Sequence, residues 1–394
     1  MQIIRAVAAG SLIFLASLAP GDSEAQSIAR RVASVRDGKV RMTYPARPDL
    51  CGWGNGISTR SSHNNTTRSW NAEQNDDVAF DDECSVGPAR LVLTLSEGRV
   101  ERIRAYVGGR WRSASDVTDL GQVSAREVVD YLFDIANSGS GKAAQEAIFP
   151  ATIAGDVNVI QPLYDLARNE SRRSDVRNQA VFWLSQQPDE RAVDLLETIL
   201  KTGRSDDIRD KAIFGLSQHR SGRGFAILRQ YAEDNRAPED LRAKAIFWLG
   251  QRKGTDRFDY LRGLYTRLDS DDLKDKVIFA MSQQKDDASM RWLIDLASNS
   301  REPVEMRKKA LFWAGQGGGN IEMLTSMYDR TREDELKEHM IFVFSQRRER
   351  AAVDKLMQIA RNDPDRDMRR KAMFWLGQSR DPRVSAFLSD IITR

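Results

Sequence analysis

The chain has 394 residues, of which 30% are charged and 41% are hydrophobic, counting Ala, Val, Ile, Leu, Met, Phe, Trp, Tyr and Cys. This apolar content suffices for buried cores and excludes a wholly disordered chain. The formal net charge is only +3, from 60 basic and 57 acidic residues, which excludes the one-sided field of a dedicated nucleic-acid binder. With three histidines and two cysteines, good metal ligands are few, and we expect no metal and no cofactor.

Residues 1–25 have the pattern of a secretory signal peptide. Arg5 precedes the apolar stretch Ala6–Ala19, and the small residues Ser23 and Ala25 stand just before Gln26. This apolar stretch is too short for a stable membrane anchor. No later run approaches the roughly 18 apolar residues of a transmembrane helix. We therefore expect an exported protein, periplasmic or extracellular, without a transmembrane segment.

The two cysteines, Cys51 and Cys84, are expected to form a disulfide, because export brings them into an oxidising compartment. In the loop-entropy description such a cross-link stabilises the folded chain by about 3 to 4 kcal/mol. A reactive cysteine would need a CxxC motif or a histidine partner, and His63 stands alone in a polar loop. The cysteines therefore indicate a structural disulfide.

Residues 26–120 are predicted to form a small β-rich domain. Apolar residues alternate with a period of two in Val40–Tyr44, Ala89–Leu95 and Val100–Val107. The short segment Ser96–Arg99 joins the last two as a hairpin turn.

An acidic cluster, Asp76, Asp77 and residues 81–83, stands apart from the rest of the predicted β domain. It leaves two alternatives open: a solvated loop, which we favour, or a calcium site in an extracytoplasmic loop.

From Ser124 the period changes to that of helices. Ser124 and Glu127 have the spacing of a capping box ahead of an apolar helical face. Downstream, one block recurs seven times, and its closing glutamines are spaced 32, 33, 32, 33, 30 and 32 residues apart. A period of this size, with one amphipathic helix before each block and one within it, predicts a solenoid of helical hairpins over residues 124–394. The blocks are Asp175–Gln186, Asp207–Gln218, Asp240–Gln251, Asp272–Gln283, Glu305–Gln316, Glu335–Gln346 and Asp367–Gln378.

These blocks resemble the HEAT-repeat family, and most closely its short bilin-lyase-type repeats. Residues Leu241–Gly250 match the pattern hydrophobe-Arg-x-x-Ala-x-x-x-Leu-Gly of that second helix. The resemblance covers about residues 124–394 and implies a mainly α fold there, an α-α superhelix (HEAT-like solenoid). It says nothing about the small disulfide-stapled β domain that is predicted to precede it. It is weak for function, because this architecture mostly serves binding. The iron-holding His-Glu pairs of the deoxyhypusine hydroxylases are absent from the sequence.

On a helical wheel, with the acid that opens each block as position 0, positions 1, 5, 6 and 9 form an apolar core stripe. Position 8 alternates between large and small residues. We expect its tryptophans to be buried against the small residue of a neighbouring repeat. In chain order position 8 holds Trp183, Gly215, Trp248, Ala280, Trp313, Val343 and Trp375.

The opposite side of the same helix is unexpectedly uniform. Position 7 is phenylalanine in all seven blocks: Phe182, Phe214, Phe247, Phe279, Phe312, Phe342 and Phe374. Position 11 is always glutamine: Gln186, Gln218, Gln251, Gln283, Gln316, Gln346 and Gln378. Position 4 is mostly lysine, at Lys211, Lys244, Lys276, Lys309 and Lys371, with Gln179 and His339 as exceptions.

Two interpretations of the phenylalanine and glutamine rows stay open. In the first, the side chains pack from rung to rung and only stabilise the superhelix. In the second, they form an apolar ladder edged by amides on the concave face and bind an extended peptide or glycan. The charged rows favour structural use, because each position-4 lysine follows an acid by four residues. The basic residues at position 2 resemble the ladders that link repeats in this family. We therefore expect a protein or peptide partner and no nucleic acid.

The resulting hypothesis is a non-catalytic exported scaffold that holds a protein or peptide on the concave face of the solenoid. One alternative is a lyase- or hydrolase-type enzyme of the cell envelope, although no set of catalytic residues stands out from the repeat pattern. The other alternative is a purely structural envelope spacer.

Overall fold

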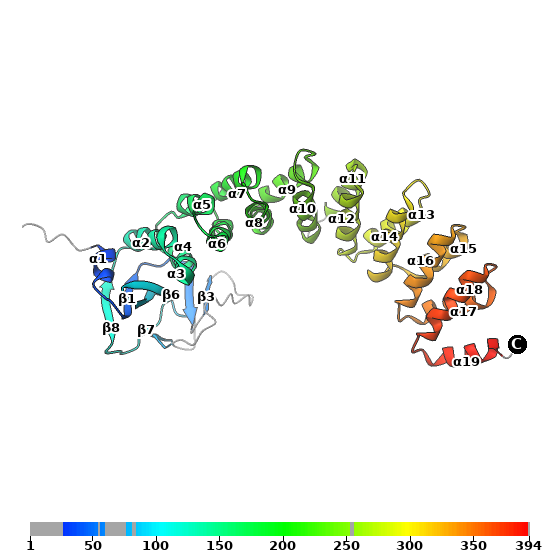
Figure 1. Cartoon of the computed structure of the whole chain (residues 1–394), viewed down its shortest axis with the longest axis horizontal. Coiled ribbons are helices and arrows are strands. Elements are labelled where there is room, and N and C mark those ends of the chain that lie inside the picture. The colour runs from blue at the N-terminus through cyan, green and yellow to red at the C-terminus, as the bar shows by residue number, and fades with distance from the viewer. Residues whose placement is uncertain (1–26, 54–55, 60–75, 81–83, 253–255, 393–394) are drawn as a thin grey trace, which may run out of the picture. The chain divides into compact units, whose positions relative to one another are not determined.

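The computed structural model describes residues 27–53, 56–59, 76–80, 84–252 and 256–392. The chain divides into two compact units, residues 1–157 and residues 158–394, whose elements are labelled in Figure 1. The predicted signal peptide, residues 1–25, lies outside the described residues. Within the described part of the chain, no helix is long and apolar enough to cross a lipid bilayer.

Unit 1 is built around a four-stranded sheet with the order β6-β5-β1-β8. Strands β6, β5 and β1 pair antiparallel, whereas β8 runs parallel to β1. The predicted hairpin is confirmed, because β5 pairs with β6 through a turn in which Glu97 and Gly98 both have positive φ. The residues that alternate with a period of two are those that the sheet buries. In β1 they are Val40, Met42 and Tyr44, which have no exposed surface. The four strands are β1 (Gly38–Tyr44), β5 (Ala89–Ser96), β6 (Arg99–Val107) and β8 (Val117–Gln122).

Two short strand pairs accompany this sheet, and the disulfide is attached to one of them. Cys51 lies in β2 and is bonded to Cys84, with the two Cα atoms 5.3 Å apart. The predicted disulfide is therefore present. The backbone of Gly52 also exchanges two hydrogen bonds with Ser85, next to Cys84. The pairs are β2 (Leu50–Trp53) with β3 (Gly56–Thr59), and β4 (Val78–Ala79) with β7 (Arg110–Trp111).

Among the described residues of unit 1, four helices are present: α1 (Ile28–Ala33), α2 (Ala125–Ser138), α3 (Gly141–Glu146) and α4 (Ile148–Thr152). The predicted cap is present, because Ser124 Oγ accepts a hydrogen bond from the Glu127 backbone N–H at 3.2 Å. Glu146 at the end of α3 accepts hydrogen bonds from the Arg102 side chain and the Ile103 backbone of β6, which ties α3 to the sheet. The predicted boundary at residues 120–124 thus marks where β8 ends and α2 begins, while the two compact units divide at residue 157.

Unit 2 consists of seven helical hairpins and a closing helix, so the predicted mainly α solenoid is confirmed. Successive second helices contact one another, and each also contacts the first helix of its own hairpin. The first helices are α5 (Ile160–Arg168), α7 (Glu190–Thr202), α9 (Arg223–Glu233), α11 (Arg257–Arg267), α13 (Asp287–Ser298), α15 (Ile321–Arg330) and α17 (Arg350–Asn362). The second helices are α6 (Ser174–Ser185), α8 (Asp206–Gln218), α10 (Glu239–Gln251), α12 (Asp271–Ser282), α14 (Val304–Gln316), α16 (Asp334–Ser345) and α18 (Arg366–Gly377). Helix α19 (Pro382–Ile392) follows.

We number the hairpins repeats 1 to 7 in chain order. The predicted core positions are buried: in α10 they are Leu241, Ala245, Ile246 and Leu249, each at most 4% exposed. This burial directs the core side of every second helix toward the first helices and neighbouring repeats. The opposite side, which carries positions 0, 4, 7 and 11, is left facing outward.

Candidate functional site

The phenylalanines at position 7 all reach solvent. None of the seven is buried; five are half-buried, while Phe247 and Phe374 are 37% and 59% exposed. Positions 0, 4, 7 and 11 fall within about 60° of one another on a helix of 3.6 residues per turn. The same geometry that buries positions 1, 5, 6 and 9 therefore holds these rings at the surface.

The rings are not isolated from one another, because they form a continuous row along the second helices. From repeat 2 to repeat 7, each ring contacts the next, with centroid separations between 4.9 and 6.5 Å. Phe247 and Phe279 stack with their planes 10° apart, and Phe312 and Phe342 stack with theirs 7° apart. We call this row the aromatic stripe. Its nine rings, in contact order, are Phe214, Trp248, Phe247, Phe279, Trp313, Phe312, Phe342, Trp375 and Phe374.

The prediction that all the position-8 tryptophans are core residues is wrong for three of the four. Trp183 is buried at 6% exposure, as predicted. Trp248, Trp313 and Trp375 are half-buried, and each packs against the phenylalanine of the preceding repeat. Position 8 flanks position 7, so an indole there can turn toward the outward side and join the stripe.

The small residues at position 8 have a different neighbour from the predicted one. A Cβ placed on Gly250 would lie 2.6 Å from Ala280 Cβ, and one on Gly315 would lie 2.4 Å from a methyl group of Val343. Position 8 of the even repeats therefore packs against position 10 of the repeat before. Large and small residues alternate because the true period is two hairpins, and a tryptophan joins the stripe in repeats 3, 5 and 7.

The glutamines at position 11 form a row beside the stripe. Gln186 is half-buried and the other six are exposed. In four repeats the glutamine Nε2 donates to the serine that precedes it, at Gln186, Gln218, Gln283 and Gln346. Each of those serines donates in turn to the carbonyl of the position-7 phenylalanine, at 2.7 Å. These bonds orient the amide group within its own helix.

The predicted pairing of position-4 lysines with position 0 of the same helix is not what the structure shows. Lys244 pairs with Asp210 at 3.2 Å and Lys309 pairs with Asp275 at 3.5 Å. Both acids are position 3 of the preceding repeat, as is Glu338, the partner of Lys371. Packing brings position 3 of one rung beside position 4 of the next, so these three lysines link repeats and are locally neutralised, whereas Lys276 pairs with Asp275 of its own helix.

The basic residues at position 2 act within a hairpin, and some of them also link neighbouring repeats, as their resemblance to family ladders implied. Arg307 pairs with Glu333 of the next repeat at 2.5 Å, and Lys337 pairs with Asp363 of the next repeat at 2.9 Å. Arg242 Nε donates to the carbonyl of Ala232, at the end of the first helix of the same repeat, at 3.0 Å. Arg177, Arg209 and Arg307 make the equivalent bond at 2.9 to 3.0 Å. These arginines satisfy carbonyls that a helix end leaves without partners, and their charge is committed to the fold.

His339 occupies position 4 in repeat 6, where five other repeats have lysine. Its ring lies 6.0 Å from that of Phe342, so it borders the stripe. Burial lowers the pKa of His339, and the neighbouring Lys308 ammonium lowers it further. The side chain is therefore neutral at pH 7.

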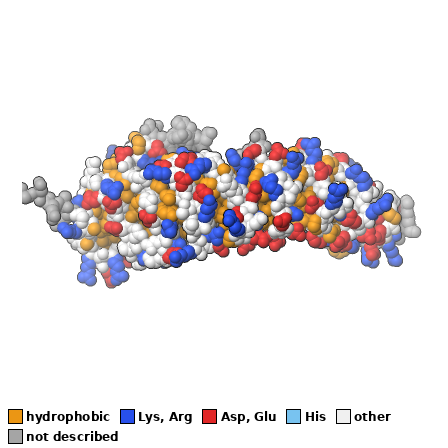
Figure 2. All heavy atoms as spheres, turned by 90° about the horizontal axis from the view of Figure 1, so that it is seen from above, with side chains coloured by type: hydrophobic (Ala, Val, Ile, Leu, Met, Phe, Trp, Pro, Cys, Tyr) orange, Lys and Arg blue, Asp and Glu red, His pale blue; other side chains and the backbone are white. Residues whose placement is uncertain are grey.

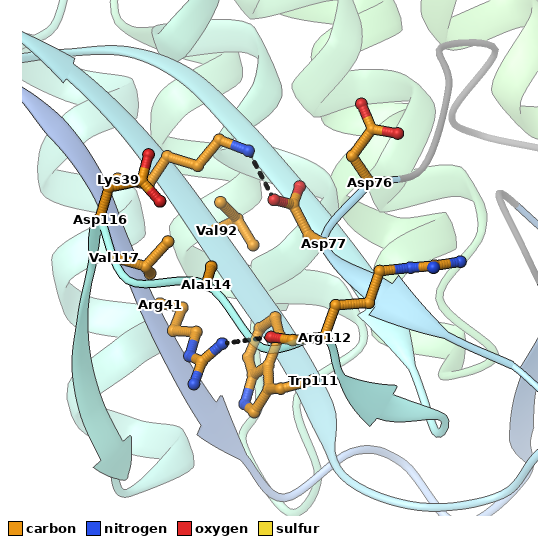
Figure 3. A pocket seen from close by; sticks show the side chains of 10 residues that line it. All are labelled: Lys39, Arg41, Asp76, Asp77, Val92, Trp111, Arg112, Ala114, Asp116 and Val117. Carbon is orange, nitrogen blue, oxygen red and sulfur yellow. Dashed lines mark hydrogen bonds and ion pairs between the residues drawn. The ribbon is translucent and has the colours of Figure 1, made fainter.

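Unit 1 has a small hollow of about 70 Å³ beside β1 and β7, drawn in Figure 3. Two of its basic lining residues are ion-paired: Lys39 Nζ lies 2.7 Å from Asp77, which also lines the hollow, and Arg41 binds Asp119, outside the lining, at 2.8 Å. The Arg41 guanidinium also lies 5.1 Å from the centre of the Trp111 ring.

The calcium alternative receives no support from the part of the acidic cluster that the structure describes. Asp77 faces Lys39, with Arg104 3.9 Å away, and the Asp76 carboxylate points elsewhere (Figure 3). Two cations beside Asp77 oppose binding of a third. Residues 81–83 lie outside the described residues. Among the residues that are described, no group of three His, Cys, Asp or Glu side chains is arranged to hold a metal.

The comparison with protein families bears on unit 2. The sequence profile of the PBS lyase HEAT-like repeat matches residues 176–202, which span α6 and α7. Unit 2 therefore resembles an array of such repeats, and we refer to it by this resemblance as the HEAT array. The match covers one repeat junction, and the remaining blocks repeat the same pattern in sequence and structure. Among curated proteins, no sequence relative matches the chain.

Solved structures with helical repeats resemble the HEAT array at low identity. Human deoxyhypusine hydroxylase in complex with glycerol is 16% identical over 64% of this chain and 96% of its own, with a TM-score of 0.28. Kap121p bound to Ste12p is 13% identical over 63% and 32%, with a TM-score of 0.38. The CpcE–CpcF complex of phycocyanin lyase from Nostoc sp. PCC7120 is 12% identical over 59% and 87%, with a TM-score of 0.25. Similarities at these TM-scores carry no conclusion about this chain.

Sequence reasoning found both outward rows but missed three members of the stripe. The missed residues, Trp248, Trp313 and Trp375, fall on odd repeats. Position 3 carried the same signal, because its acids Asp210, Asp275 and Glu338 occur only in even repeats. A period of two hairpins, read from both positions, would have indicated that position 8 has two different environments.

Proposed function

We propose that this protein is an exported, non-catalytic binding scaffold whose HEAT array holds a protein or peptide against the aromatic stripe. The observation that carries the proposal is the stripe itself: nine rings in unbroken contact that stay half-buried or exposed along six repeats. An apolar surface of this extent is typical of an interaction site. On curved repeat arrays, such surfaces line the concave side that receives partners.

The arrangement of the stripe favours binding at low entropic cost. Each ring is held by the next, so little side-chain freedom is left to lose when a partner docks. The glutamine row supplies carbonyl and amide groups at regular intervals beside the rings, which suits the repeating donors and acceptors of an extended peptide backbone. The stacking that stabilises the array and the exposure that permits binding thus coexist in the same side chains.

The chemistry of this face supports binding over catalysis. Its rows consist of phenylalanine, tryptophan, glutamine and lysine, and three of the lysines are ion-paired to the preceding repeat. His339 is the one imidazole on the face, and its neighbours there are the Phe342 ring and the Lys308 ammonium. At neutral pH neither neighbour is a nucleophile that His339 could activate as a base.

Export remains part of the proposal. It is supported by the signal-peptide pattern of residues 1–25 and by the disulfide, since bonds of this kind persist in oxidising compartments.

The test is a selection of peptides from a displayed library of 15-residue sequences on the full chain. Selected peptides are then titrated against the wild type and against Phe247→Ser/Phe374→Ser, which alters the two most exposed rings. We expect at least about a tenfold loss of affinity in this variant. Phe225→Ser is the matched control, because Phe225 is also half-buried but lies on the first helix α9.

Tryptophan fluorescence measures binding directly, because a peptide on the stripe should shift the emission of Trp248, Trp313 and Trp375. Selected peptides that bind the double variant as well as the wild type would contradict the proposal. A selection that enriches no peptide would favour the spacer alternative.

A further inference from the structure

Acidic side chains gather along one long edge of the HEAT array (Figure 2). Acidic residues also open the second helices, and five of them lie at the starts of α10 and α12. All five are exposed, and within the described residues none of the five carboxylates forms an ion pair. We call them the acidic patch: Glu239, Asp240, Asp269, Asp271 and Asp272.

The same positions are neutralised elsewhere in the array. In repeats 5 and 6, Glu305 and Glu335 share Lys308, at 3.0 and 2.9 Å. In repeat 7, Asp367 pairs with Arg370 at 3.1 Å. An acid in the first turn of a helix is favoured by the helix dipole, and this accounts for acids at every start. It does not account for the absence of a cation partner from all five acids in repeats 3 and 4. In repeat 2, Asp206 pairs with Arg209, and Asp207 has no ion pair but accepts a hydrogen bond from Asn178 at 2.6 Å.

The acidic patch lies beside the most accessible inner part of the stripe. Position 0 and position 7 point in nearly the same direction and are roughly 10 Å apart along a helix axis. Asp240 and Phe247 have this relation in α10, as do Asp272 and Phe279 in α12. Between them, Lys244 and Lys276 are each paired with an aspartate, so they do not neutralise the acidic patch.

We infer that the partner's docking segment is basic, with apolar side chains that rest on Phe247 and Phe279 and lysine or arginine side chains that reach the acidic patch. This inference rests on the proposed function and names the chemistry of its partner. The inference is based on charge complementarity. Unpaired surface carboxylates beside an apolar face attract and orient a cationic partner, which affects specificity and association rate more than raw affinity. The roughly 10 Å between the acid at position 0 and the phenylalanine at position 7 is within the combined reach of a basic side chain and a short stretch of extended chain.

The test uses three fluorescein-labelled 12-residue peptides with the same leucine and serine residues. The first carries four lysines, the second has these replaced by glutamine, and the third by glutamate. Fluorescence anisotropy with the full chain measures affinity at about 50 and 300 mM salt, where the screening length falls roughly from 14 to 6 Å. We expect the lysine peptide to bind at least about tenfold more tightly than the glutamate peptide at low salt, and this advantage to shrink at high salt.

The matched variants are Asp240→Asn/Asp272→Asn and Asp287→Asn/Asp295→Asn. Both change the net charge equally, but Asp287 and Asp295 are exposed residues of the first helix α13. The first variant should weaken binding of the lysine peptide about fivefold, while the second should leave it unchanged. Circular dichroism of both variants checks that the fold is retained.

Equal binding of all three peptides, or no effect of the first variant, would overturn the inference while leaving the proposed function intact. Failure of all three peptides to bind would also overturn the inference. The displayed-library selection then decides separately whether the stripe binds peptides at all.

Discussion

Phe247 and Phe279 stand on neighbouring rungs of the HEAT array and stack with their ring centroids 6.3 Å apart and their planes 10° apart. One pair thus shows how a surface row can also be part of the packing between repeats. Phe279 continues the contact to Trp313 at 4.9 Å. Substitutions in the stripe therefore need to be compared by the number of rings that each phenylalanine contacts.

Phe279→Ala should destabilise the protein by about 2 kcal/mol, because the half-buried ring loses contacts with two other rings. Phe374→Ala should cost less than about 1 kcal/mol, since Phe374 is 59% exposed and contacts Trp375 of its own helix. Urea unfolding of the full chain, followed by circular dichroism, measures both. Equal losses of unfolding free energy in the two variants would contradict the view that ring contacts between repeats stabilise the array.

Gly250 and Gly377 occupy the same position 10 but should respond to alanine with opposite signs. A Cβ on Gly250 would lie 2.6 Å from that of Ala280, whereas no atom lies within 4 Å of one on Gly377. Gly250→Ala should therefore be destabilising, since overpacking by about 1 to 3 kcal/mol exceeds the helix-propensity gain of up to about 1 kcal/mol. Gly377→Ala should be neutral or slightly stabilising. Thermal unfolding of the two variants gives the comparison.

Arg242→Met should destabilise the chain by about 1 to 3 kcal/mol. Arg242 is 9% exposed, and its loss leaves the Ala232 carbonyl without this charged donor. The control is Arg236→Met, because the Arg236 side chain is 92% exposed and pairs with Asp234 at the surface. That change should stay within about 0.5 kcal/mol in the same unfolding measurement. A control effect as large as that of Arg242→Met would refute the capping role.

Asp363 should make stability depend on acid pH. Burial raises the pKa of its carboxyl, but hydrogen bonds from Lys337, the Asp365 backbone and Tyr328 outweigh burial and hold the pKa below the ordinary 3.8. Because the folded-state pKa is the lower one, this contribution is present above about pH 4 and is lost as the pH falls through the folded-state value.

Asp363→Asn should therefore be destabilising at pH 7, and its difference from the wild type should narrow below about pH 4. Unfolding midpoints measured between pH 7 and pH 3 test this dependence, with the exposed Asp269→Asn as control. A difference that stays constant across this range would show that the ion pair with Lys337 contributes nothing measurable.

The sequence by itself determined the repeat array, its hairpin spacing and the outward position of the phenylalanine and glutamine rows. These features depend on helical periodicity, which is a local property: once positions 1, 5, 6 and 9 are apolar, positions 7 and 11 must face away. The β5–β6 hairpin and the Cys51–Cys84 pairing were accessible for similar reasons, a short turn in one case and a single possible partner in the other.

Only the tertiary structure decided how neighbouring repeats meet. A helical wheel treats each helix alone, so it placed Trp248 in the core and paired Lys244 with its own helix. In the fold, Trp248 packs on Phe214 and Lys244 reaches Asp210, both in the preceding repeat. The parallel pairing of β8 with β1, and the place of α2 to α4 beside the sheet, likewise depend on contacts between distant segments. Rung-to-rung packing joins residues some 30 positions apart, and no local period records that contact.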